Sequence, residues 1–250
     1  MGEDEFGTKI GRLTKSSTYL EYCQRIYGYR EYFFNMTDKE QLDYILNSIP
    51  VSSEDIIAEI GCANGSVLSL LTAKYGCNGI GIDRLDKSVF NCKDGRTAYI
   101  NADIDNISDC RIKPAILLSV DSLYFSKDLN DTIGQLKSLG CKRMYFFYSQ
   151  YIFDEAATDK SILLSDKTKL ARALQSNGIL FKTIDYSENE RRLYQNSLPM
   201  LREYKKAFAA EGNTDLYEQK YKEDLLGAEL YRKGLAARYL YIIEAGDTPA

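Results

Sequence analysis

Four segments of the chain carry glycines and carboxylates at spacings that suit the binding of a nucleoside-containing ligand. The first, residues 59–65, reads Glu-Ile-Gly-Cys-Ala-Asn-Gly. Glycines there let the backbone turn tightly and approach a ligand closely, with a helix N-terminus pointing at it. Asp83 ends the next apolar run, where a carboxylate binds ribose hydroxyls in dinucleotide-type folds. Residues 101–104 and 118–121 follow further along the chain, each with an aspartate.

The absence of histidine limits the chemistry that the chain can perform. The sequence has 250 residues, no His, a net charge of −4 and six cysteines, none in a C-x-x-C pair. It therefore lacks the usual neutral-pH base and the usual zinc ligands, and we expect no metal site. The acidic balance argues against nucleic acid as a partner, and no apolar run approaches the ~20 residues of a membrane span. Catalysis must use carboxylates, Tyr, Lys, Cys or a cofactor.

Short apolar runs alternate with helix-like segments between residues 37 and 186. Such alternation predicts an α/β fold, with a parallel sheet covered by helices on both faces. We expect a frayed tail over the first dozen residues, a helix capped by Thr37, and another helix beginning near Leu85. The predicted strands cover residues 56–60, 79–82, 97–100, 115–120, 144–148, 179–186 and 238–244.

The alternation stops after residue 186, and helical patterning fills residues 187–235 before the last strand. We interpret this segment as a helical cap over the carboxyl edge of the sheet, where open α/β sheets bind ligands. The expected organisation is an N-terminal tail and helical segment over 1–36 that contributes to the lid. The core would span 37–186 and 236–250, with the cap inserted at 187–235.

The order of these segments resembles that of class I S-adenosylmethionine-dependent methyltransferases, which have a Rossmann-like sheet of seven strands. Residues 59–65 are similar to the acidic-x-Gly-x-Gly-x-Gly loop that holds the methionine end of the cofactor in that family, with Ala63 in place of the middle glycine. The resemblance implies that the cofactor is S-adenosylmethionine. It assigns cofactor binding to Glu59, Gly61, Cys62, Ala63, Gly65, Asp83, Arg84, Asp103, Ile104 and Ser119.

Residues 33–36, 121–125 and 147–150 are similar to segments of bacterial small-molecule methyltransferases that carry helical caps. For the acceptor side we expect Asp121 and Tyr124 to be catalytic. Tyr124, Tyr148, Gln150 and Tyr194 are the candidates for substrate binding. Methyl transfer is an in-line displacement that depends mainly on alignment of the reactants, so the lack of histidine is no obstacle.

The sequence favours N-methylation of a small amine, because acidic and tyrosine side chains suit a cation and no strong base is evident. O- or C-methylation of a small metabolite remains open, as does a protein that binds S-adenosylmethionine without catalysis. An NAD-dependent oxidoreductase is disfavoured by the glycine spacing, and an RNA or protein methyltransferase by the negative charge. We expect a small-molecule acceptor as partner, no membrane association and a cytoplasmic location, and a homodimer is left open.

Overall fold

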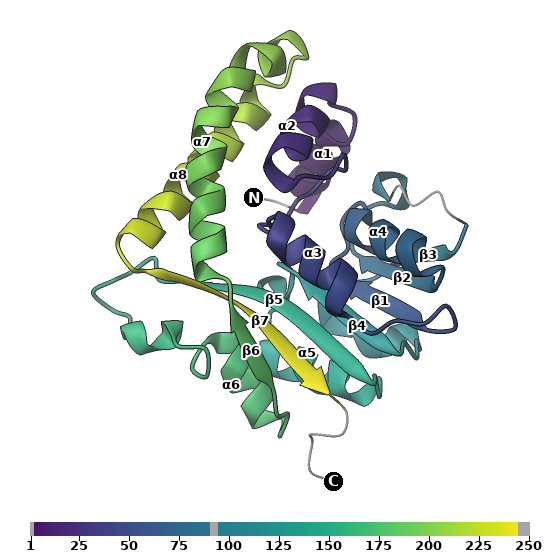
Figure 1. Cartoon of the computed structure of the whole chain (residues 1–250). Coiled ribbons are helices and arrows are strands. Elements are labelled where there is room, and N and C mark those ends of the chain that lie inside the picture. Colours follow the sequence, from purple (N-terminus) through teal and green to yellow (C-terminus); the bar gives the residue numbers. More distant parts are fainter. Residues whose placement is uncertain (1–2, 91–94, 245–250) are drawn as a thin grey trace.

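The computed structural model describes residues 3–90 and 95–244, with side chains from residue 7 onward, and its centre is a seven-stranded sheet. The strands are β1 (Ile56–Ile60), β2 (Asn78–Asp83), β3 (Thr97–Asn101), β4 (Ile116–Val120), β5 (Arg143–Tyr151), β6 (Lys182–Asp185) and β7 (Ala236–Glu244). Their order across the sheet is β3-β2-β1-β4-β5-β7-β6 (Figure 1). Only β7 runs antiparallel to its neighbours, β5 and β6. The predicted seven-stranded α/β fold is confirmed, although the sheet is mixed instead of wholly parallel.

Helices cover both faces of the sheet. α3 (Lys39–Ser48) and α4 (Ser66–Tyr75) lie on one face, and α5 (Leu129–Ser138) and α6 (Lys169–Ser176) on the other. Because side chains alternate along a strand, Leu118 of β4 joins the first core and Leu117 the second. Burial on both faces is why these strands read as continuous apolar runs instead of alternating ones.

A helical hairpin rises from the sheet between its last two strands in the sequence. It consists of α7 (Ser187–Ala210) and α8 (Thr214–Arg232), and α7 begins directly after β6 (Figure 1). Two N-terminal helices, α1 (Glu3–Leu13) and α2 (Ser17–Tyr27), lie beside it. Arg12 binds both carboxylate oxygens of Asp215 at 2.6 and 2.8 Å, and the Tyr22 hydroxyl lies 2.7 Å from Oγ of Ser197. These contacts join the N-terminal segment to the hairpin.

Three local predictions are wrong. Within the expected frayed tail, the described residues from Glu3 onward form α1, since Ile10 is buried against Leu85 and Val89. The segment after β2 is a short 3-10 turn at Lys87–Val89 instead of a helix near Leu85. The residue that caps α3 is Asp38, whose carboxylate accepts the Gln41 amide, and Thr37 is buried behind it.

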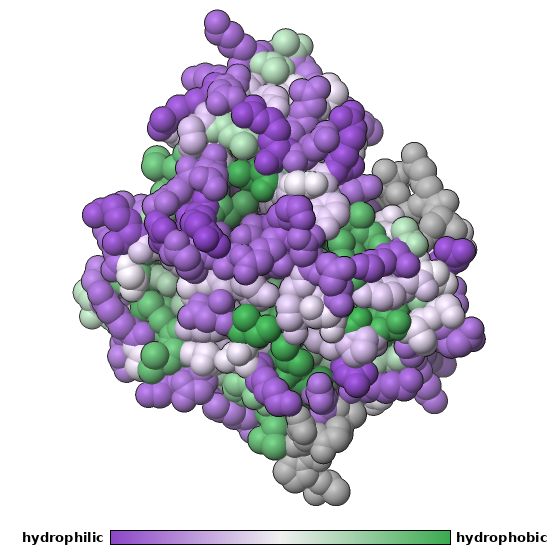
Figure 2. Space-filling view, viewed as in Figure 1, coloured by the Kyte–Doolittle hydropathy of each residue, from purple (hydrophilic) through white to green (hydrophobic). Residues whose placement is uncertain are grey.

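Surface hydropathy differs between the outer end of the α7–α8 hairpin and the recess beside it. The outer end of the α7–α8 hairpin is mostly hydrophilic on the face shown in Figure 2, and hydrophobic residues show in the recess beside it. Within the described residues, no helix combines the length and the apolar character needed to cross a membrane.

Two mid-helix glycines predict opposite effects of the same substitution. A Cβ at Gly227 of α8 would lie 2.3 Å from Cζ of Tyr194, whereas a Cβ at Gly11 of α1 would meet no atom within 4 Å. We expect Gly227→Ala to lower the free energy of unfolding by about 1–3 kcal/mol through overpacking. Gly11→Ala, the matched control, should raise it by up to about 1 kcal/mol, because alanine favours the helix. Urea denaturation of the two variants checks both signs.

Candidate active site

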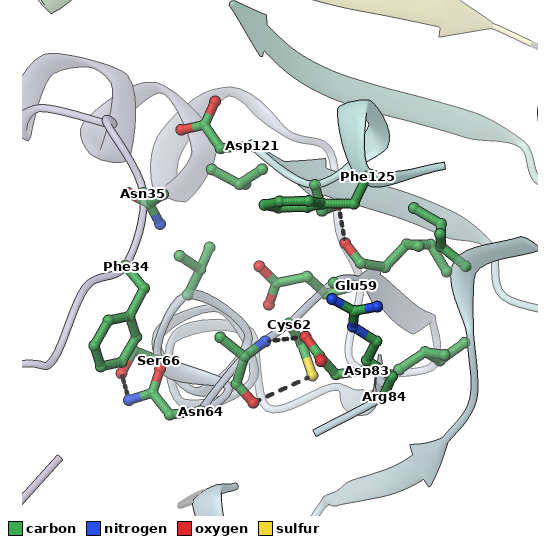
Figure 3. A pocket seen from close by; sticks show the side chains of 18 of the residues that line it. Phe34, Asn35, Glu59, Cys62, Asn64, Ser66, Asp83, Arg84, Asp121 and Phe125 are labelled. Atoms are coloured by element: carbon green, nitrogen blue, oxygen red, sulfur yellow. Dashed lines mark hydrogen bonds between the residues drawn. The ribbon is translucent and has the colours of Figure 1, made fainter. Parts of the chain in front are cut away.

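A cavity opens at the carboxyl ends of β1, β2 and β4, next to the segment that joins α2 to α3 (Figure 3). Its empty volume is about 1090 Å³, including the part open to solvent. One half of its wall comes from the β1–α4 loop and from the ends of β2 and β3. The other half comes from residues 32–35 and from the loop after β4. Because the sequence assigns the first set of segments to the expected cofactor and the second to the expected acceptor, we call these the cofactor half and the acceptor half.

The β1–α4 loop needs its glycines for two physical reasons. Gly61, Ala63 and Gly65 all have positive φ angles, of 69°, 47° and 79°. A Cβ at Gly61 would also lie 2.2 Å from Cβ of Ser122, so the β1 and β4 loops pack together only because that atom is missing. Ala63 adopts a left-handed conformation that strains any residue with a Cβ, and its amide donates to the carboxylate of Asp83 at 2.8 Å.

Glu59 carries an unused hydrogen-bonding atom at the floor of the cavity. The residue is 3% exposed, and Oε2 is the one buried side-chain nitrogen or oxygen without a hydrogen-bond partner among the residues described. Burial raises the pKa of Glu59 to about 8. A buried polar atom without a partner costs free energy, so Glu59 fits a ligand that brings a hydrogen-bond donor or a positive charge.

Most residues assigned to the cofactor line the cofactor half. They are Glu59, Gly61, Cys62, Ala63, Asp83, Arg84, Asp103 and Ile104. Asp83 accepts the amides of Ala63 and Leu85 at 2.8 and 3.0 Å, and burial raises the pKa of its carboxyl. Gly65 caps α4 through its left-handed conformation and lies outside the lining. Ser119 is fully buried, and its hydroxyl lies 2.6 Å from that of Ser122, which in turn donates to the carbonyl of Ile60.

The acceptor half is mainly aromatic, and both residues predicted to be catalytic line it. Asp121 follows β4 with a φ angle of 54°, and its carboxylate accepts Arg238 Nη1 at 2.6 Å and Nη2 at 3.0 Å. The same carboxylate accepts the amide of Met36 at 2.8 Å. Although 44% of Tyr124 is exposed, burial of its hydroxyl and then the charge of Asp121 raise the pKa of Tyr124 well above its usual value, so the phenol stays protonated and can donate a hydrogen bond.

Three residues predicted to bind substrate do not line this cavity. Tyr148 packs in the core with α5 and α6, although its ring centroid lies 6.1 Å from that of Tyr124. Oε1 of Gln150 accepts the amide of Lys169 at 3.1 Å, at the start of α6. Tyr194 lies on α7, and its hydroxyl is 3.0 Å from that of Tyr151. No residue of α7 or α8 is among the residues that line the cavity.

Asn35 is a polar residue of the acceptor half that sequence reasoning did not select. Its Oδ1 accepts the amide of Thr37 at 3.1 Å, which fixes the orientation of the carboxamide. The side-chain nitrogen then points into the cavity (Figure 3). The sequence of residues 33–36 is similar to a segment of the resembled family, but nothing local in it indicates that residue 35 lines the cavity. Other lining residues not selected from the sequence are Tyr32, Phe33, Phe34, Asn64, Ser66, Val67, Phe125 and Lys127.

Comparisons with known proteins place the fold in one class. No family model matches the chain, and no curated protein matches it in sequence. Among solved structures, phosphoethanolamine N-methyltransferase 2 of Haemonchus contortus, in complex with phosphomonomethylethanolamine and S-adenosylhomocysteine, has a TM-score of 0.71 at 12% identity. That match covers 94% of this chain and 60% of the other, so the chain spans less than two thirds of that protein.

Two further structures agree. Cyclopropane synthase MmaA2 of Mycobacterium tuberculosis has a TM-score of 0.67 at 14% identity, over 94% of this chain and 98% of the other. An S-adenosylmethionine-dependent methyltransferase of Geobacter sulfurreducens, in complex with S-adenosylhomocysteine, has a TM-score of 0.60 at 12% identity, over 89% and 97%. The chain thus has the Rossmann-like fold of class I S-adenosylmethionine-dependent methyltransferases.

The residues of the cofactor half fit such a cofactor. The unpartnered Oε2 of Glu59 suits its ammonium group, and the N-terminus of α4 suits its carboxylate. Among the described residues, no group of three or more His, Cys, Asp or Glu side chains is placed to hold a metal ion.

The raised pKa of Glu59 predicts a pH dependence of stability. With a pKa of about 8 in the folded protein and about 4.5 unfolded, the folded state holds one more proton between these values. Stability contributed by this group is present below pH 4.5 and falls as the pH rises toward 8, by at most about 1.4 kcal/mol per pH unit. We expect Glu59→Gln to remove this fall. Denaturation of both proteins at pH 5.5 and 7.5 measures the difference, and parallel losses would show that Glu59 titrates normally.

Proposed function

We propose that the chain transfers a methyl group from S-adenosylmethionine to a small molecule, with an amine as the favoured acceptor. The observation that carries the proposal is the buried Oε2 atom of Glu59, which has no hydrogen-bond partner, in a cavity that also presents Gly61 and Asp83. In this proposal Glu59 holds the ammonium group of the cofactor and the N-terminus of α4 holds its carboxylate. Asp83 holds the ribose hydroxyls, and Asp103 and Ile104 lie against the adenine.

The chemistry that follows is a displacement without a protein nucleophile. When bound, S-adenosylmethionine supplies an electrophilic methyl group whose bond to sulfur breaks as the acceptor lone pair forms the new bond, with the electron pair left on sulfur. The protein binds and aligns the reactants, which is the main source of catalysis in such a step. Because the Asp121 carboxylate already accepts Arg238 and the Met36 amide, the acceptor enters neutral and loses its proton to water.

An aromatic wall supports an amine as the acceptor. Tyr32, Phe34, Tyr124 and Phe125 line the acceptor half. Aromatic faces attract cations, so they would stabilise the positive charge that forms on the nitrogen as the methyl group is transferred, and they would hold the methylated ammonium product. The likeness to a cyclopropane synthase keeps a carbon acceptor as the second candidate.

Titration calorimetry tests the cofactor. We expect the chain to bind S-adenosylmethionine and S-adenosylhomocysteine and not NAD. Asp83→Ala should weaken this binding by about 1–3 kcal/mol, the scale of a hydrogen bond to a charged group. Asp86→Ala is the matched control, because Asp86 lies three residues on and caps only the exposed turn at Ser88. Binding of NAD alone, or equal effects of the two variants, would contradict the proposal.

Mass spectrometry tests the acceptor. The protein is incubated with cofactor carrying a labelled methyl group and with panels of small amines, alcohols and unsaturated compounds. Label on nitrogen is the expected result, and label on carbon would select the second candidate. Cofactor binding without transfer to any panel would indicate a non-catalytic protein.

Asn35→Asp tests the acceptor half. Aspartate keeps the oxygen that accepts the Thr37 amide but replaces the donor that points into the cavity. We expect KM for the acceptor to rise about 10-fold or more, with cofactor affinity unchanged, because a hydrogen bond of about 1.5 kcal/mol is lost. Steady-state kinetics beside calorimetry separates the two effects. Loss of cofactor affinity instead would place Asn35 in the cofactor half.

A further inference from the structure

Arg238 of β7 is the largest side chain that is fully buried among the described residues. Its guanidinium donates to Asp121, to Oγ of Ser149 at 2.8 Å and to Oε1 of Gln41 at 2.7 Å. It also donates to Oγ1 of Thr37 at 3.2 Å, and it lies over the ring of Phe147. A buried charge is tolerated only when it is paired and hydrogen-bonded, and this guanidinium meets that condition with partners from four parts of the chain.

One end of this hydrogen-bond network lies in the α7–α8 hairpin, which we call the cap. Glu190, in the first turn of α7, is fully buried, and its carboxylate lies 3.5 Å from Nη1 of Arg238. The hydroxyls of Ser149 and Tyr151 donate to it at 2.9 Å, and the hydroxyl of Tyr231 on α8 donates to it as well. Both helices of the cap are therefore tied to the guanidinium.

The other end of the network lies in the wall of the cavity. Asp121 has a left-handed backbone, which costs free energy for a residue with a side chain even though aspartate tolerates it best. Arg238 and the amide of Met36 hold its carboxylate there. Met36 directly follows Asn35, and Arg238 also binds Thr37 on the far side. The two segments that make up the acceptor half thus meet on one guanidinium.

We propose that Arg238 is a positioning residue through which the cap acts on the acceptor half: the Glu190–Arg238–Asp121 bridge holds residues 35–37 and the end of β4 in register. The inference rests on the proposed methyl transfer for its kinetic consequence. It also explains how a cap that contributes no residue to the lining of the cavity can matter for the reaction.

A second buried ion pair in the cap provides the matched control. Asp224 of α8 is 1% exposed, and its carboxylate lies 2.7 Å from Nζ of Lys220 and accepts the hydroxyl of Ser197. It resembles Glu190 in burial, in its cationic partner and in its position on a cap helix. It has no contact with Asp121 or Arg238 among those described. Glu190→Gln and Asp224→Asn should both lower the midpoint of thermal unfolding.

The two variants should differ in their effect on kcat. With Glu190→Gln we expect kcat to fall about 10-fold or more, since small displacements of reacting groups have effects of that size, while the Kd for S-adenosylmethionine is unchanged. With Asp224→Asn we expect kcat and Kd to remain those of the parent. Equal losses of kcat in both variants would overturn the proposal, because they would show a general effect of a weakened cap.

Hydrogen exchange supplies a readout that does not depend on turnover. The amide of Met36 is bonded to Asp121, so its exchange should accelerate in Glu190→Gln and in Arg238→Lys, and not in Asp224→Asn. Lysine keeps the charge but lacks the fork that binds both oxygens of Asp121. Unchanged exchange of Met36 in Arg238→Lys would reject the bridge. If the parent protein transfers no methyl group, the proposed function fails, while the exchange experiment still decides on the bridge.

Discussion

A single buried guanidinium sets the arrangement of the acceptor side of this protein. A positive charge removed from water must find several acceptors, and Arg238 finds them on α3, on the loop after β4, on β5 and on the cap. No two of those partners are close in sequence apart from Thr37 and Gln41. The antiparallel β7 places Arg238 opposite Ser149 of β5, in the middle of this group.

In the cofactor half the main constraint is different: two backbone loops must approach each other closely. The β1 loop touches the β4 loop where Gly61 has no side chain, and Asp83 at the end of β2 holds the amide of Ala63. These contacts are short-range consequences of parallel strands whose carboxyl ends meet at one edge. They leave Glu59 buried with one oxygen unpartnered. A folded protein with such an atom is preorganised for a ligand, since binding removes a cost already present.

The two halves of the cavity differ in chemical character. The cofactor half presents charge and backbone, whereas the acceptor half presents aromatic faces and the amide of Asn35. The cap stands behind the acceptor half, with its polar outer end in solvent and its buried carboxylate on the network. The fold is shared with proteins that act on quite different acceptors, as the names of an ethanolamine methyltransferase and a cyclopropane synthase show. A shared fold therefore does not fix the acceptor.

Sequence patterns were enough to predict the seven strands and the helical segment before the last of them, and to single out Glu59, Asp83 and Asp103, which line one cavity. Strand burial, helix periodicity and the Glu59–Gly65 loop are local signals, because each depends on neighbours along the chain. The composition of the acceptor half follows from long-range contacts. Arg238 in an apolar strand gives no sign that it binds Asp121. Gln150 contacts the start of α6 and Tyr194 lies within the α7–α8 hairpin, so neither reaches the cavity. These outcomes depend on contacts between residues up to about two hundred positions apart, such as Gln41 with Arg238, and no local pattern encodes which distant partner will satisfy a buried charge.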